Sequence, residues 1–119
     1  MILVVDDDPT FLERAREILN RTRQVLFASN SQQAMKLAQD LGFSVMLVDL
    51  DLGEEDGLVL IRQVNQKFPG LPIIAITEAP KKIIVELAKE FGAVEILHKP
   101  ITTAWKPVVE RVRAMADRA

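Results

Sequence analysis

Apolar residues alternate between two spacings along this chain. Short, mostly apolar runs rich in β-branched residues cover residues 2–5, 25–28, 45–48, 73–76 and 95–97. Runs of this length without a polar face are typical of strands that helices cover on both sides. The pattern therefore predicts five short strands in the interior of the fold.

Between these runs, apolar residues recur every three or four positions, which is the spacing of one helix face. The clearest repeats are Leu12, Ala15, Ile18 and Leu19; Ala34, Leu37, Ala38 and Leu41; and Leu58, Ile61, Val64 and Phe68. Two further helices are expected after the fourth and fifth strands. Strands that alternate with helices form a parallel sheet with right-handed crossovers, so we predict a three-layer α/β sandwich.

Residues that favour helix ends agree with these spans. Asp8, which precedes a proline, is predicted to cap the first helix, Ser31 the second and Asp56 the third. The fourth helix is expected to open near Pro80, and the fifth to run from about Thr103 to the C-terminus. The chain shows no internal repeat, linker or low-complexity segment.

Composition narrows the class of protein. The chain has 119 residues and no cysteine, which predicts one domain over residues 1–119 and excludes disulfides, cysteine zinc sites and thiol redox chemistry. A net charge of −2 provides no basic field for nucleic acid. No apolar run approaches the roughly 20 residues that a membrane span needs, and the apolar start runs straight into three aspartates, unlike a signal peptide. We therefore expect a cytoplasmic protein that binds neither nucleic acid nor membrane.

Polar residues that could bind a metal or take part in a reaction lie where the predicted strands end. Asp6 and Asp7 follow the first strand, Asp49 the third, Thr77 the fourth and Lys99 the fifth. The carboxyl ends of parallel strands share one edge of the sheet, so these side chains should converge. Three carboxylates at such range repel one another unless protons or a cation compensate them. Mg²⁺, which favours a few carboxylate oxygens and retains several waters, is the expected cation.

Asp49 is the best candidate for covalent chemistry. A carboxylate beside a metal can attack a phosphoryl group and form an acyl phosphate. The segment 50–57 that follows is polar and contains glycine, so it can wrap the site. Lys99 is predicted to neutralise phosphoryl charge and Thr77 to donate a hydroxyl hydrogen bond.

The order and spacing of four motifs resemble the receiver domains of two-component response regulators. The motifs are Val4-Val5-Asp6-Asp7, Leu47-Val48-Asp49 with Gly57 eight residues on, Ile76-Thr77, and Lys99-Pro100. The resemblance covers essentially the whole chain. It implies a flavodoxin-like, doubly wound (βα)5 fold with a five-stranded parallel sheet in the order 2-1-3-4-5.

The resemblance also assigns roles to individual residues. It implies that Asp49 accepts a phosphoryl group from a histidine kinase, a phosphotransfer protein or a small phosphodonor. Asp7 and Asp49 would ligate Mg²⁺, or Mn²⁺ in its place, directly, Asp6 through water and Asp51 through its backbone carbonyl. Lys99 would pair with Asp49 and then with the phosphoryl group. Such a domain is a signalling switch and not a turnover enzyme.

The same resemblance implies how phosphorylation would be coupled to a protein-interaction surface. Thr77 would move toward the phosphoryl oxygens and couple the reaction to the surface of the fourth helix, fifth strand and fifth helix. That surface would contact an output domain or effector protein, or form a homodimer through the last two helices. The bond between Lys99 and Pro100 is typically cis in this family.

Three positions depart from the family pattern. Ile96 stands where an aromatic residue usually moves with the threonine, and isoleucine lacks the hydroxyl that such a switch uses. Glu78 stands where a small residue is common. Gly53 replaces a common proline and is expected to loosen the loop after Asp49.

Two alternative functions stay open from the sequence. The changes at Glu78 and Ile96 are compatible with a receiver-like interaction module that acts without phosphorylation. The segment Asp49-Leu50-Asp51-Leu52 loosely matches the nucleophile motif of haloacid-dehalogenase-type phosphatases, although that motif normally lies on the first strand of a longer chain. His98, beside Lys99, is expected to face away from it because neighbouring strand residues alternate in direction.

Overall fold

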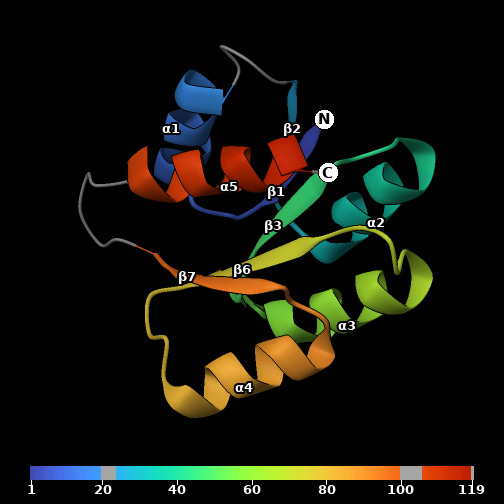
Figure 1. The fold of residues 1–119 in the computed structure, drawn as a ribbon, viewed down its shortest axis with the longest axis vertical. Helices are drawn as coiled ribbons and strands as arrows, with labels where there is room; N and C mark the ends of the chain where they lie inside the picture. Colours follow the sequence, from blue (N-terminus) through green and yellow to red (C-terminus); the bar gives the residue numbers. More distant parts are fainter. Residues whose placement is uncertain (20–23, 100–105, 119) are drawn as a thin grey trace.

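The structure is a computed structural model that describes residues 1–19, 24–99 and 106–118. Within these residues, five parallel strands form one sheet in the order β2-β1-β3-β6-β7 (Figure 1). They are β1 (Ile2–Val5), β2 (Val25–Ala28), β3 (Val45–Asp49), β6 (Ile73–Thr77) and β7 (Glu95–His98). When only the five strands of this sheet are numbered along the chain, β6 is the fourth and β7 the fifth. The observed order is then the predicted order 2-1-3-4-5, so the predicted doubly wound topology is confirmed.

Helices cover both faces of the sheet (Figure 1). They are α1 (Pro9–Leu19), α2 (Ser31–Asp40), α3 (Gly57–Lys67), α4 (Lys82–Phe91) and α5 (Lys106–Arg118). Successive strand residues point to opposite faces. In β1, Ile2 and Val4 therefore join the core beneath α1 and α5, whereas Leu3 and Val5 join the core beneath α2, α3 and α4. None of the helices in the described residues is long and apolar enough to cross a membrane.

The helix ends agree with the sequence except at α2. Thr10 N donates to Asp8 Oδ1 at 3.0 Å, and Leu58 N donates to Asp56 Oδ1 at 2.9 Å, so both predicted caps are present. The prediction of Ser31 as the α2 cap was wrong. Asn30 takes that place with an extended backbone, and its Oδ1 accepts from Gln33 N at 2.8 Å. Two adjacent residues were able to cap this helix, and only the backbone conformation distinguishes them.

The structure describes the start of α4, whereas it describes α5 only from Lys106. Helix α4 begins at Lys82, two residues after Pro80, and its N-cap residue Lys81 makes no side-chain cap. Helix α5 is described from Lys106 onward. The predicted start at Thr103 and the predicted cis bond at Lys99-Pro100 lie outside the described residues.

The loop after β3 forms a hairpin that the sequence did not predict. Strands β4 (Asp51–Leu52) and β5 (Glu55–Asp56) pair in antiparallel fashion. Gly53, the first of the two turn residues, has a φ of 67°, which suits a two-residue turn of type II′ and which proline cannot adopt. In this structure the glycine permits a tight turn, and the expectation that Gly53 loosens this loop stays a prediction.

Candidate functional site

The sheet places the predicted site residues along one edge. Asp49 ends β3 and Thr77 ends β6, while Asp6 and Lys99 directly follow β1 and β7. These strands are neighbours in the sheet, and β1, β3 and β6 each bury an apolar run. An open cavity of about 810 Å³ lies over the edge, lined in part by Asp49, Thr77 and Lys99. The convergence expected from the strand ends is therefore present.

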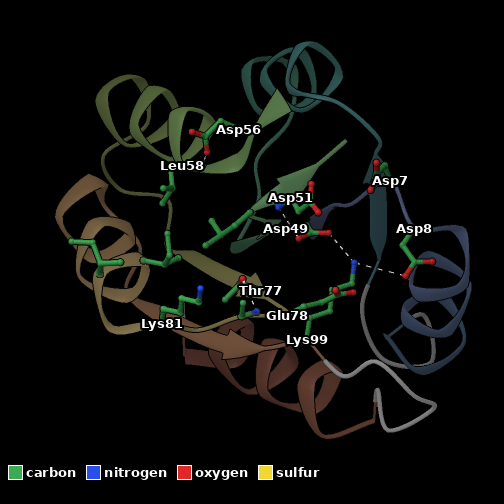
Figure 2. Close-up of a pocket in the computed structure, with 14 residues that line it drawn as sticks. Asp7, Asp8, Asp49, Asp51, Asp56, Leu58, Thr77, Glu78, Lys81 and Lys99 are labelled. Carbon is green, nitrogen blue, oxygen red and sulfur yellow. Dashed lines mark hydrogen bonds and ion pairs between the residues drawn. The ribbon is translucent and has the colours of Figure 1, made fainter. Parts of the chain in front are cut away.

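Lys99 links the carboxylates of this edge (Figure 2). Its Nζ donates to Asp49 Oδ2 at 2.8 Å and to both oxygens of Asp6 at 3.0 and 3.1 Å. It also lies 3.8 Å from Asp8 Oδ2, a contact that the sequence analysis missed. Lys99, Asp6 and Asp49 are all buried. One ammonium thus faces two buried carboxylates, which leaves the interior of the site with excess negative charge.

Burial and neighbouring charges shift the pKa values of Asp6 and Lys99. Burial, followed by the charge of Asp49, raises the pKa of Asp6 to about 7, although the Asp8 amide and Lys99 act in the opposite direction. Burial tends to lower the pKa of Lys99, but hydrogen bonds and charges from Asp49 and Asp6 outweigh it and raise that pKa. The site therefore takes up a proton or a cation readily.

Asp6, Asp7 and Asp49 form a cluster suited to a divalent cation. One carboxylate oxygen from each lies within 4.8 Å of the others. Asp7 is exposed, whereas Asp6 and Asp49 are buried. Neighbouring ligands of a magnesium ion lie about 3 Å apart and opposite ligands about 4 Å apart, so the cluster fits an ion that some oxygens reach directly and others through water.

Asp51 and Thr77 lie beside the cluster. Asp51 N donates to Asp49 Oδ1 at 3.0 Å, which orients the Asp49 carboxylate from the side opposite to the Lys99 contact on Oδ2. The Asp51 side chain is exposed, and the role of its carbonyl stays a prediction. Thr77 Oγ1 accepts from Ala79 N at 3.2 Å, so the hydroxyl is engaged with its own loop here.

The structure places two of the residues that depart from the family pattern, Glu78 and Ile96. Glu78 lines the cavity, and its carbonyl oxygen lies 3.1 Å from His98 Nε2. His98 is exposed while Lys99 is buried, in agreement with the expected alternation. Ile96 is partly buried and packs against the core beneath α2, α3 and α4.

Two residues support the site in ways that the sequence analysis did not recognise. A Cβ atom on Gly57 would lie 2.3 Å from the Asp49 carbonyl oxygen, so only glycine lets α3 start this close to β3. Phe11 is fully buried, and Lys99 Nζ lies 5.5 Å from the centre of its ring. The motif included Gly57 but not this reason for it, and Phe11 gave no signal beyond an apolar helix position.

Comparison with known proteins identifies the family. The model of the response regulator receiver domain matches residues 2–105. The chain belongs to the response regulator receiver domain family. Receiver domains are the signalling domains of two-component systems and not turnover enzymes, and they interact with histidine kinases and output domains. This assignment replaces the alternative interpretation of residues 49–52 as a phosphatase motif.

Individual relatives agree with the assignment. A response regulator receiver protein of Anaeromyxobacter sp. (strain Fw109-5) is 31% identical over 100 residues, which cover 83% of this chain and 42% of that protein. The chain thus spans less than half the length of this curated relative. A CheY-like receiver domain of Methanospirillum hungatei JF-1 has the same fold, with a TM-score of 0.86, 23% identity and coverage of 98% of this chain and 93% of the other.

A third relative is a response regulator of Burkholderia pseudomallei whose crystal structure contains a phosphorylated aspartic acid, a calcium ion and citrate. It is 29% identical with a TM-score of 0.82, over 98% of this chain and 68% of the other.

Proposed function

We propose that this receiver domain accepts a phosphoryl group on Asp49 in a Mg²⁺-dependent reaction and thereby switches a protein-interaction surface. The donor is a histidine kinase, a phosphotransfer protein or a small phosphodonor. The observation that carries the proposal is the 2.8 Å contact between Lys99 Nζ and Asp49 Oδ2 within a cluster of three carboxylates. The relative with a phosphorylated aspartic acid supports it.

The residues of the chain account for the transfer. A carboxylate oxygen of Asp49 forms the new bond to phosphorus while the bond to the donor's leaving group breaks, and the leaving group departs with the electron pair. The Asp51 amide on Oδ1 and Lys99 on Oδ2 hold the carboxylate in place before the reaction. Lys99 then compensates charge on the transferred group, and Thr77 offers its hydroxyl once the Ala79 contact is released.

Asp7 and Asp49 are proposed as direct ligands of Mg²⁺, Asp6 as a ligand through water and Asp51 as a carbonyl ligand, with Mn²⁺ as a substitute ion. When bound, the cation supplies positive charge to the phosphoryl oxygens. The fit rests on oxygens within 4.8 Å of one another and on the excess negative charge that raises the pKa of Asp6 to about 7. Lys99 alone does not neutralise this cluster.

The proposed output is the surface of α4, β7 and α5, reached through Thr77. It would contact an output domain or effector, or form a homodimer through α4 and α5. The proposal treats residues 1–119 as a single domain with a cytoplasmic location, both predicted from the sequence. Ile96 cannot make a hydroxyl hydrogen bond, so Thr77 would act here without an aromatic partner at that position.

A second candidate rests on Ile96 and Glu78. Packed isoleucine in place of a mobile aromatic residue, and a carboxylate at the cavity, favour a receiver-like module whose contacts do not depend on phosphorylation. The two candidates differ in one result. A phosphorylated domain with unchanged partner affinity and oligomeric state would support the second candidate.

The test is the intact mass of the protein after incubation with acetyl phosphate and Mg²⁺. We expect a gain of one phosphoryl group that is absent in Asp49→Asn and absent without Mg²⁺. Beryllofluoride binding to the same sample covers a short-lived phosphoryl group. Failure of both would overturn the proposal.

A further inference from the structure

The cavity over Asp49 extends beyond the residues that the proposed reaction uses. Its volume of about 810 Å³ lies within the range of about 300–1,000 Å³ typical of pockets that hold whole small molecules. The acidic end contains Asp7, Asp8 and Asp49. Four apolar residues, Leu58, Ala79, Ile83 and Ile84, line the cavity away from this acidic end, and the lining there also includes Asp56, Glu78 and Lys81. Figure 2 shows Leu58 on the opposite side of Asp49 from Asp7 and Asp8.

The first turns of two helices carry most of these apolar residues. Leu58 is the second residue of α3, and Ile83 and Ile84 are the second and third residues of α4. Leu58 packs partly against the core, whereas Ile83 is 60% exposed. A single exposed isoleucine needs no explanation. Here, however, Leu58, Ala79 and Ile84 line the same cavity as Ile83, and this cavity also reaches the carboxylate of Asp49.

We propose that the part of the cavity lined by these apolar residues is a subsite for the hydrocarbon chain of an acyl phosphate, so that the domain prefers butyryl phosphate to acetyl phosphate. The proposal rests on the proposed function, because the donor must deliver its phosphoryl group to Asp49. The occupant follows from the continuity of the cavity. When the phosphorus of an acyl phosphate lies next to Asp49, its organic leaving group would lie elsewhere in the same cavity. Leu58 and Ile83 line that cavity and would contact an apolar chain there.

The chemistry of the step is the same for both donors. An Asp49 oxygen bonds to phosphorus, the phosphorus–oxygen bond to the acyl group breaks, and a carboxylate leaves with the electron pair, so no proton or co-reactant is required. Acetate and butyrate depart through the same group and differ in two methylenes. Each fully buried methylene strengthens binding roughly fourfold. Because the cavity is open to solvent, we expect a total advantage of about fivefold for butyryl phosphate.

The experiment measures the second-order rate constant of phosphorylation by intact mass, with each donor and saturating Mg²⁺. Ile83→Ser and Leu58→Ala remove apolar contacts, and they should bring the ratio of the two rate constants to about one. Ile83 is largely exposed, so its variant should fold normally. The matched control is Val94→Ser, because Val94 is 56% exposed and lies outside the cavity lining. This control should keep the wild-type ratio.

The outcomes separate the two proposals. A wild-type preference for butyryl phosphate that Ile83→Ser abolishes and Val94→Ser retains would support the subsite. Equal rate constants for both donors in the wild type, or a preference that survives both cavity variants, would overturn the subsite and leave Asp49 phosphorylation intact. Absence of phosphorylation by either donor, together with no beryllofluoride binding, would overturn the proposed function itself and the subsite with it.

Discussion

The ammonium of Lys99 lies over the ring of Phe11, with Nζ 5.5 Å from the ring centre, and both side chains are buried. A cation over an aromatic face is stabilised by the ring's negative charge density, most strongly away from water. Phe11 therefore helps to hold an ammonium that contacts both Asp6 and Asp49. This contact joins α1, through Phe11, to the end of β7.

Replacing this ring should slow phosphorylation. We expect Phe11→Leu, which retains an apolar side chain but removes the aromatic face, to lower the rate with acetyl phosphate by about three- to tenfold. Loss of buried atoms should also cost on the order of 1 to 2 kcal/mol in the free energy of unfolding. The measurement compares phosphorylation rates at a temperature where circular dichroism shows both proteins folded.

Phe43→Leu provides the control, because Phe43 packs against the core on the other face of the sheet. This variant should phosphorylate at about the wild-type rate. Equal rates for Phe11→Leu and the wild type would show that Lys99 does not depend on the ring.

The raised pKa of Asp6 predicts how stability changes with pH. The pKa of this carboxyl is raised from its ordinary value of 3.8 to about 7 in the fold, so the folded state binds more protons between these values. Stability without metal therefore falls as the pH rises through this window. We expect metal-free wild-type protein to lose on the order of 3 kcal/mol between pH 4 and pH 8 from this group.

The measurement is urea unfolding in EDTA at several pH values. Asp6→Asn, which mimics the protonated side chain, should flatten the dependence and exceed the wild type in stability at pH 8. Mg²⁺ should stabilise the wild type most at high pH, since it replaces the proton. A wild type that is as stable as Asp6→Asn throughout the range would contradict the assignment of this pKa.

The sequence predicted the layers and the site edge because both follow from periodic burial. Strands β1, β3 and β6 each bury a short apolar run, and a polar residue ends the strand or follows it directly, so Asp49 and Thr77 were readable from spacing alone. The contacts that Lys99 makes with residues of the first helix and its start were not readable. The approach of Lys99 to Asp8 and to the Phe11 ring depends on how α1 and β7 pack, and nothing in local spacing specifies it.

Backbone conformation explains the other differences. Asn30 and Ser31 are both good capping residues, and the helix start depends on which of them is extended. Gly53 was expected to loosen a loop because glycine is flexible in an unfolded chain. In the fold, the same freedom permits a φ of 67° and a closed hairpin.

The hairpin predicts the effect of restoring the family's common residue. Gly53→Pro cannot adopt the observed φ, so we expect the β4–β5 pairing to be lost at a cost on the order of 1 to 3 kcal/mol. The hairpin also holds Glu55, whose Oε1 accepts from Ser31 N at 3.1 Å. Amide hydrogen exchange should therefore increase at Ser31 as well as in the hairpin. If the Ser31 amide kept its protection from hydrogen exchange in this variant, the hairpin would not stabilise the start of α2.

Gly57 gives the sharpest test of the link between the fold and Asp49. An added Cβ would lie 2.3 Å from the Asp49 carbonyl oxygen and 2.6 Å from Leu50 Cα, which are backbone atoms that side-chain rotation cannot relieve. Gly57→Ala should therefore push α3 away from β3, lower the free energy of unfolding by about 1 to 3 kcal/mol and slow phosphorylation because Asp49 moves.

Gly42→Ala and Gly70→Ala are matched controls, since a Cβ at either position meets nothing within 4 Å and neither residue has a positive φ. Both should leave phosphorylation unchanged and alter stability by less than about 1 kcal/mol, in the stabilising direction if the backbone angles suit alanine. Urea unfolding and phosphorylation rates on the three variants make the comparison. If Gly57→Ala behaved like these controls, α3 would tolerate a shift without moving Asp49, and the close approach would serve packing alone.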